Sequence, residues 1–209
     1  MTDASAGLEA AVAALRAGRV VAAPTESSFG LLATLDPAAL PRLFGVKPRG
    51  HEKGVPLILP DRAAWLEVAL PPLPDARRLA DRLWPGRLSI ATPARPDLDP
   101  RVTLDATVAV RLPGPSLAAE LARAVGRPLT ATSANPPGEP PLLAAAEVRA
   151  AFARQLEAGD LVVVGDVAPG GPPSTIVVVV APAARVVREG AVGADEVRRA
   201  LLDDPERER

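Results

Sequence analysis

Four short segments hold most of the residues that could bind or activate a small anionic substrate. They are Pro24-Thr25-Glu26-Ser27-Ser28-Phe29-Gly30, Lys47-Pro48-Arg49-Gly50-His51-Glu52-Lys53-Gly54, Thr132-Ser133-Ala134-Asn135 and Gly170-Gly171-Pro172-Pro173-Ser174-Thr175. Each adjoins a predicted strand, and ligands of open α/β sheets bind in loops beyond strand ends. Lys47, Arg49 and Lys53 share a loop stiffened by Gly and Pro, where cations can neutralise phosphates and Arg can bind them bidentately. Cations and hydroxyls on loops therefore suggest binding of a phosphorylated ligand.

Each segment also has a plainer interpretation when it is taken alone. The segment after Pro24 could be a hydroxyl-rich turn, the Lys47–Gly54 segment a solvated loop, and Thr132–Asn135 a turn closed by a hydroxyl. The glycines fit neither the P-loop spacing nor Gly-x-Gly-x-x-Gly, so a nucleotide would not be held in either standard way.

Arg111 closes an apolar run that begins at Thr107. Residues i and i+4 of a strand point to the same face, so Arg111 shares a face with Thr107 and is well placed to meet an anion. The alternative is an edge-strand arginine whose head reaches solvent. His51 is the only histidine and the only imidazole that could serve as a base. Its Gly and Glu neighbours favour a loop histidine in solvent.

Composition excludes several classes of site. The chain has 209 residues, no Cys and one His, which excludes disulfides, thiolate nucleophiles and His- or Cys-rich metal sites; we expect no metal ligands from the protein. Balanced charge, with 24 Lys and Arg against 25 Asp and Glu, argues against a dedicated nucleic-acid binder. The N-terminus lacks the pattern of a signal peptide, and no apolar run is long enough to span a membrane. We expect a cytoplasmic protein.

Helical and strand patterns are interleaved along the whole sequence, which predicts one α/β domain over residues 1–203, with 204–209 as a frayed tail. Some strands follow one another directly, so we expect a twisted, open, mixed β-sheet flanked by helices. Predicted helices cover 5–17, 36–45, 116–125, 144–157 and 194–202, and two more begin at Asp61 and Asp75 as N-caps. Predicted strands cover 19–23, 55–59, 87–92, 107–112, 128–132, 161–164, 175–180 and 185–188.

Seven segments resemble, in this order, the YrdC/TsaC-type threonylcarbamoyl-AMP synthase family. They are GRVVAAPTESSFGL, KPRG with KGVPLIL, WPGRLSIATP, TVAVRLP, RPLTATSANPPGEPP, PSTIVVV and VVREGAV, from residue 18 to about 193. The resemblance implies a single YrdC-like domain with a concave basic face. It implies an enzyme, a nucleotidyltransferase that makes L-threonylcarbamoyl-AMP and pyrophosphate from L-threonine, bicarbonate and ATP with Mg²⁺. The product would feed t6A modification of tRNA through partner proteins.

The resemblance also implies a role for each matched residue. Lys47 and Arg49 would be catalytic. ATP would be bound by Lys47, Arg49, Lys53, Thr107, Ser133, Asn135 and Arg188. L-Threonine would be bound by Ser27, Arg111, Thr132 and Ser174. This chemistry needs no thiol and no covalent intermediate, because positioning and charge stabilisation can suffice.

The sequence departs from the family pattern at Pro48, Gly50, Ser28, Pro137 and Leu59. These departures leave open a diverged, non-catalytic member of the fold that binds nucleotide or RNA, such as tRNA or duplex RNA. A carbamoyl-adenylate chemistry that uses carbamoyl phosphate fits poorly, because the proteins that perform it are longer and carry Cys-rich fingers.

Overall fold

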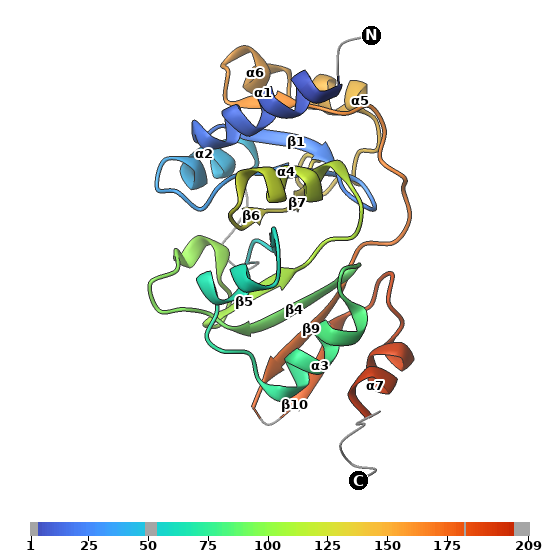
Figure 1. Ribbon diagram of the computed structural model, residues 1–209. Helices are drawn as coiled ribbons and strands as arrows, with labels where there is room; N and C mark the ends of the chain where they lie inside the picture. The colour runs from blue at the N-terminus through green and yellow to red at the C-terminus, as the bar shows by residue number, and fades with distance from the viewer. Residues whose placement is uncertain (1–3, 49–53, 182, 203–209) are drawn as a thin grey trace.

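The strands form two mixed sheets that are joined through neighbouring short strands (Figure 1). The structure is a computed structural model that describes residues 4–48, 54–181 and 183–202. The four-stranded sheet has the order β7-β2-β1-β8 and the six-stranded sheet the order β10-β9-β4-β5-β3-β6. The predicted mixed α/β class is confirmed, with the strands divided between two sheets rather than one.

The four-stranded sheet is built from the first hairpin and two later strands. Its strands are β1 (Val20–Pro24), β2 (Phe29–Leu32), β7 (Thr132–Ser133) and β8 (Leu161–Val163). The helices in contact with it are α1 (Ala4–Arg16), α2 (Ala39–Val46), α4 (Leu117–Val125), α5 (Ala145–Ala151) and α6 (Ala153–Glu157). Alternate residues of β1 pack into two separate apolar clusters, Val21 and Ala23 with α1 and α4, Val20 and Ala22 with the larger core. This strand is therefore buried on both faces.

The six-stranded sheet packs against helix α3 through β4, and at its other end Ile58 of β3 and Leu129 of β6 pack with residues of α1 and α4. Its strands are β3 (Leu57–Ile58), β4 (Leu88–Pro93), β5 (Thr107–Arg111), β6 (Leu129–Thr130), β9 (Thr175–Val180) and β10 (Ala183–Arg188). The remaining helices are η1 (Ala63–Glu67), α3 (Pro74–Leu83), η2 (Pro100–Val102) and α7 (Ala194–Leu202). Leu88, Ile90, Val108, Val110 and Val177 belong to the main core, where α3 packs on β4 and α7 on α3. Side chains alternate along a strand, so the residues between them face away from these helices.

Most predicted elements are confirmed, and the differences have local causes. The strand predicted over 128–132 is two short strands, β6 and β7, one in each sheet, because the chain crosses between the sheets at Ala131. The helix predicted over 144–157 is interrupted at Phe152, whose ψ is 30°. Asp75 is not an N-cap: α3 begins at Pro74, and Asp75 pairs with Arg78 within the helix. Strand β2 was missed, because the hydroxyl-rich segment before it suggested only a loop.

Several predicted caps are confirmed. Ser116 accepts a hydrogen bond from the Ala119 backbone N–H at 3.3 Å, and α4 ends at Gly126 with φ at 77°. Asp61 precedes the N-cap of η1, which is Arg62, and its side chain accepts from the Ala64 N–H at 3.0 Å. Within the described ranges no helix has the length and apolarity that a membrane span requires. The predicted tail 204–209 lies outside the described residues.

Candidate active site

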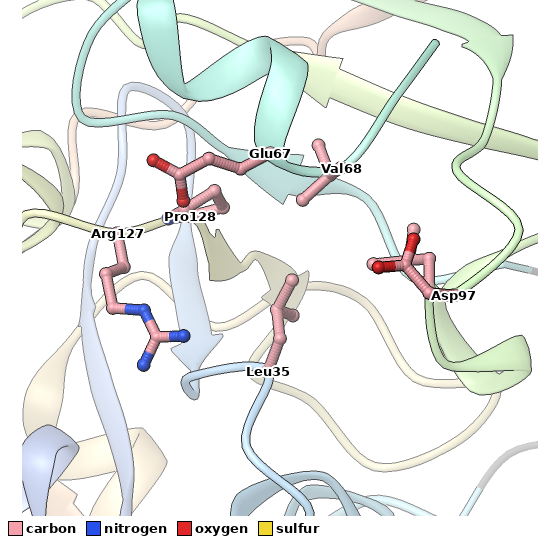
Figure 2. Close-up of a pocket in the computed structure, with 7 residues that line it drawn as sticks. Leu35, Glu67, Val68, Asp97, Arg127 and Pro128 are labelled. Carbon is pink, nitrogen blue, oxygen red and sulfur yellow. The ribbon is translucent and has the colours of Figure 1, made fainter.

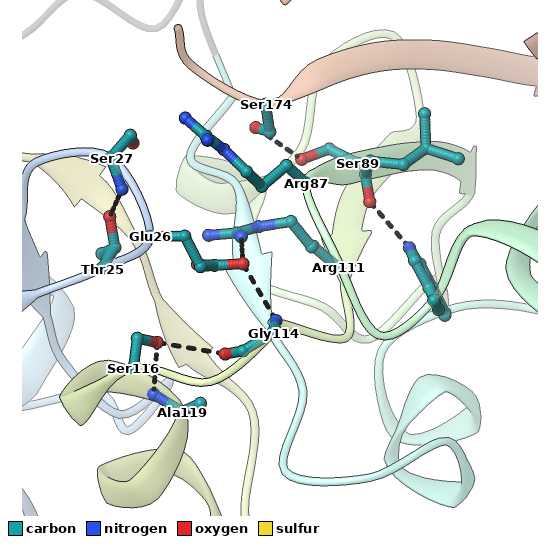
Figure 3. A network of polar contacts seen from close by, with 12 residues as sticks. Thr25, Glu26, Ser27, Arg87, Ser89, Arg111, Gly114, Ser116, Ala119 and Ser174 are labelled. Atoms are coloured by element: carbon teal, nitrogen blue, oxygen red, sulfur yellow. Dashed lines mark hydrogen bonds and ion pairs between the residues drawn. The ribbon is translucent and has the colours of Figure 1, made fainter. Parts of the chain in front are cut away.

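The polar residues of the first hairpin occupy a tight turn between β1 and β2. Pro24 pairs with Phe29, so only Thr25–Ser28 form the connection. The Thr25 hydroxyl donates to the Ser28 carbonyl at 2.8 Å and accepts from the Ser27 and Ser28 N–H groups at 3.3 Å each. This segment is therefore a turn closed by the Thr25 hydroxyl. The same turn presents the side chains of Glu26 and Ser27, so it can also form part of a binding site (Figure 3).

Lys47 joins two of the sequence segments that were singled out. It follows α2 directly, and its side-chain ammonium donates to the Ser133 carbonyl at 2.6 Å, the Ser133 hydroxyl at 3.3 Å and Asn135 Oδ1 at 3.0 Å. Lys47 and Asn135 are buried, with 9% and 7% of their surface exposed. Ser133 pairs with Gly30 at the start of β2. The structure thus holds this cation against the edge of the four-stranded sheet, next to the Thr25–Ser28 turn.

Asn135 uses its whole amide group in this arrangement. While Oδ1 accepts from Lys47, Nδ2 donates to the Pro136 carbonyl at 3.0 Å and the Glu139 carbonyl at 2.6 Å. The Glu139 N–H returns to the Pro136 carbonyl at 3.2 Å, and Gly138 has φ at 83°, as a type II turn requires. Pro137 therefore fits the turn that Asn135 closes. Asn135 is placed to orient Lys47.

A second group of polar residues lies on the face of the six-stranded sheet opposite α3 and α7. We call this face the site face. Its polar residues are Ser89, Thr107, Arg111, Ser174 and Arg188, and the apolar residues Ala91, Ala109 and Ile176 lie between them. Ser89 lies opposite Arg111 in the β4–β5 register, because Ile90 pairs with Val110. The Ser89 and Ser174 hydroxyls lie 3.2 Å apart (Figure 3).

Arg188 reaches the site face because of a β-bulge. Val186 pairs with Val177, and in a regular ladder Arg188 would then oppose Thr175 on the core face. The register shifts between Val186 and Arg188, so Arg188 pairs with Ile176 instead. Bulges re-aim side chains in this way. Its guanidinium donates to the Ser174 carbonyl at 2.7 Å from Nη2 and 3.2 Å from Nε, and Nη2 also lies 3.3 Å from the Ser174 hydroxyl.

Arginines gather around Ser174. Burial lowers the pKa of Arg188, and repulsion from the nearby Arg111 guanidinium lowers it further. Arg87 precedes β4, two residues from Ser89 on the same face, and donates to the Pro172 carbonyl. Like charges brought together in a partly buried place favour an anionic ligand.

Glu26 is the carboxylate of this group, and sequence reasoning did not select it. Its Oε1 accepts from Arg111 Nη1 at 2.5 Å and from the Gly114 N–H at 2.9 Å. Only 12% of the Glu26 side chain and 10% of the Arg111 side chain are exposed. The pair ties the first hairpin of one sheet to the end of β5 in the other. The presence of a carboxylate between hydroxyls in the Thr25–Ser28 turn was the available signal.

Thr175, the residue after Ser174, anchors this segment by hydrogen bonds to the loop that follows β10. Its hydroxyl donates to the Val192 carbonyl at 2.5 Å and accepts from the N–H groups of Gly190 and Val192 at 2.9 and 3.1 Å. A side chain at Gly190 would place its Cβ 2.2 Å from the Pro173 carbonyl oxygen. The loop after β10 therefore packs directly against the segment that presents Ser174.

The remaining predicted residues are distributed as follows. Thr107 lies at the opposite end of β5 from Arg111, and its hydroxyl donates to the Leu104 carbonyl at 2.7 Å. Leu104 and Thr103 adjoin Gly54, where a Cβ would approach the Thr103 carbonyl carbon to 3.1 Å. Thr132 is buried and pairs with Leu31. Arg49, Lys53 and His51 lie outside the described residues.

A separate cavity of about 140 Å³ lies elsewhere, between the ends of both sheets (Figure 2). Leu35, Glu67, Asp97 and Arg127 line it together with Val68, Leu98 and Pro128. Leu35 follows the end of β2, whereas the Thr25–Ser28 turn precedes its start. None of the predicted site residues lines this cavity, so it is distinct from the candidate site.

Comparison with known proteins shows the family to which the chain belongs. The Sua5/YciO/YrdC family model, which carries the description "Telomere recombination", matches residues 13–190. The chain belongs to this family. It is 46% identical over 142 residues to the threonylcarbamoyl-AMP synthase of Stenotrophomonas maltophilia, covering 64% of this chain and 74% of the relative. It is 43% identical over 176 residues to that of Chromohalobacter salexigens, covering 79% and 89%.

A solved structure of a longer relative shares the fold. The crystal structure of P. abyssi Sua5 complexed with L-threonine superposes with a TM-score of 0.83 at 29% identity. The superposition covers 93% of this chain and 57% of the Sua5 chain. The chain thus spans a little over half the length of that relative, and the shared part is the YrdC-like domain with its mixed sheets.

Proposed function

We propose that this protein makes L-threonylcarbamoyl-AMP from L-threonine, bicarbonate and ATP and releases pyrophosphate, which makes it a nucleotidyltransferase. The observation that carries the proposal is the contact of Lys47 with Ser133 and Asn135. It joins two motifs 86 to 88 residues apart in sequence and holds an ammonium at the edge of the four-stranded sheet. The names of the relatives and the L-threonine bound by Sua5 support the same activity.

The chemistry requires two anionic substrates and a free amine. Condensation of the threonine amine with bicarbonate gives a carbamate and water. A carbamate oxygen then attacks the α-phosphorus of ATP, and pyrophosphate leaves. Charge accumulates on phosphate oxygens during this step, so fixed cations accelerate it by electrostatic stabilisation.

The described residues divide these tasks between the two sheets. Lys47, with Ser133, would bind the ATP phosphates, joined by Arg49 and Lys53 of the neighbouring loop. Arg111 and Ser174 would bind the threonine carboxylate, with Ser27 and Thr132 lining the threonine pocket and Arg188 and Thr107 facing the nucleotide. Asn135 would act on the nucleotide through Lys47. The described residues contain no cluster of three or more His, Asp or Glu that could hold a metal. We therefore expect Mg²⁺ to be bound through the ATP phosphates and water.

The product would pass to proteins that transfer the threonylcarbamoyl group to tRNA. Its mixed anhydride of carbamate and phosphate is an activated acyl donor, so a transfer step must consume it. The protein would then act first in a two-stage modification, which we expect to take place in the cytoplasm.

The test is pyrophosphate release from ATP and Mg²⁺ by the wild-type protein and by Lys47→Ala. We expect release from the wild type that needs both L-threonine and bicarbonate, and a loss of at least 100-fold in Lys47→Ala. Arg62→Ala is the control, because Arg62 pairs with Asp81 on the surface. Unchanged release by Lys47→Ala would refute the assignment of this cation to the ATP phosphates.

A further inference from the structure

The negative charge of Glu26 lies where it should weaken binding of the carboxylate of the proposed substrate, L-threonine. Its Oε1 lies 2.5 Å from Arg111 Nη1, and Arg111 is the residue that would bind the threonine carboxylate. A carboxylate beside a carboxylate site weakens anion binding when only charge is considered. The position therefore calls for a reason other than net charge.

The contacts of Glu26 supply that reason. One oxygen accepts from both Arg111 Nη1 and the Gly114 N–H, which follows β5 by three residues. This fixes one edge of a guanidinium that is nearly buried. In the described part of the chain the Arg111 side chain makes no other hydrogen bond, and neither Nε nor Nη2 is among the fully buried, unpartnered atoms. Its remaining donors are therefore open to a ligand.

Charge balance is consistent with one monoanionic group. Arg111, Arg188 and Glu26 together carry one net positive charge, and Arg188 lies close enough to Arg111 to be repelled by it. Without Glu26, two like charges would face each other and Arg111 would lose its fixed partner. A substrate carboxylate would bring these three residues to neutrality, and the nearby Arg87 would leave the site with one positive charge.

We propose that Glu26 is a positioning residue, which holds Arg111 with its open edge toward the carboxylate of the amino-acid substrate. The proposal rests on the function proposed above and adds a residue to its threonine subsite. Bidentate recognition of a carboxylate depends on the orientation of the guanidinium plane, so a misplaced Arg111 binds poorly even when its charge is present.

Kinetics of Glu26→Ala and Glu26→Gln separate positioning from charge. Positioning predicts a rise of at least tenfold in the KM for L-threonine in Glu26→Ala, with the KM for ATP within twofold of the wild type. The KM of Glu26→Gln for L-threonine should lie between those of the wild type and Glu26→Ala, because the amide oxygen of Gln can still accept from both donors. A charge effect alone predicts the reverse, a threonine KM at or below that of the wild type in both variants, and would overturn the proposal.

A double-mutant cycle tests whether Glu26 acts through Arg111. The double variant with Glu26→Ala and Arg111→Ala should have the same threonine KM as Arg111→Ala alone. A rise as large as the one that Glu26→Ala causes in the wild type would contradict the proposal. Asp99→Ala is the matched control, because Asp99 also binds one arginine side chain and one backbone N–H, both of Arg101. It should leave the threonine KM unchanged. Should Glu26→Ala fail to fold, Glu26→Gln carries the comparison.

Binding measured by calorimetry separates this proposal from the proposed reaction. The wild type should bind L-threonine more tightly than L-threoninol, which lacks the carboxylate, and Glu26→Ala should lose most of that preference. If pyrophosphate release fails but this preference is present and depends on Glu26, the reaction is refuted and the role of Glu26 stands. A wild type without the preference, or a variant that keeps it, overturns the role of Glu26.

Discussion

At the scale of single residues, the site depends on side chains that hold other side chains. Asn135 and Glu26 are each engaged by hydrogen bonds to a cation of the site, Lys47 or Arg111. The types of these residues can be found in the sequence, and their partners cannot, because the contacts join positions 85 to 88 residues apart. Family resemblance selected Asn135, whereas Glu26 needed the structure.

Replacing Asn135 should weaken ATP binding through Lys47. Asn135→Ala removes one of the three acceptors of the Lys47 ammonium, and a hydrogen bond to a charged group contributes about 1.5–3 kcal/mol. We expect the KM for ATP to rise about 10- to 100-fold, with a smaller effect on the KM for L-threonine. Steady-state kinetics of pyrophosphate release measures both. Equal rises for the two substrates would point to a general disturbance of the fold instead.

At the scale of elements, short irregularities bring the site together. The β-bulge between Val186 and Arg188 turns Arg188 to the site face, and the break between β6 and β7 carries Ser133 into the four-stranded sheet. Periodicity located the strands themselves, because their apolar residues alternate or run continuously. It could not locate a bulge or a change of sheet, because both depend on the register with a distant partner.

Thr175 is expected to stabilise the segment that presents Ser174. Thr175→Val keeps the shape of the side chain but leaves the N–H groups of Gly190 and Val192 without their acceptor. Unsatisfied buried groups cost about 1–3 kcal/mol each, so we expect the free energy of unfolding to fall by about 2–4 kcal/mol. Urea denaturation measures the change. Thr103→Val, which removes an exposed hydroxyl–carbonyl bond, is the control and should have little effect.

Glu147 should make α5 sensitive to acid. Its carboxylate accepts hydrogen bonds from the N–H groups of Leu143 and Ala144, and these hydrogen bonds lower the pKa of Glu147 below its usual value. The stabilisation is therefore present above the pKa of the unfolded chain and is lost as the pH falls through the lower, folded pKa. We expect Glu147→Gln to be less stable than the wild type at pH 7 and equally stable well below pH 4, as judged by denaturation at each pH. A difference that persists unchanged in acid would contradict this role.

At the scale of the whole molecule, the candidate site draws on both sheets. One part of the site lies at the four-stranded sheet and contains Lys47 and Ser133. The other part lies at the six-stranded sheet and contains Arg111, Ser174 and Arg188. The Glu26–Arg111 ion pair crosses between them. Sequence patterns established the α/β class, while the arrangement of two sheets follows from long-range pairing that no local pattern contains.

Substrates that contact both sheets should stabilise the whole domain. At a concentration about 100 times its Kd, a ligand adds about 2.7 kcal/mol, which corresponds to about 5–10 °C in Tm for a domain of this size. We expect ATP with Mg²⁺ and L-threonine to raise the Tm of the wild type by this amount. Lys47→Ala should show little response to ATP under the same conditions. A wild type that does not respond would argue against binding at this site.

The most direct test of the account is the identity of the product. The wild-type protein is incubated with ATP, Mg²⁺, L-threonine and ¹³C-bicarbonate, and the nucleotides are analysed by mass spectrometry. We expect an AMP adduct that contains threonine and one labelled carbon, formed in step with pyrophosphate. Pyrophosphate without the labelled adduct, or no turnover by the folded protein, would contradict it.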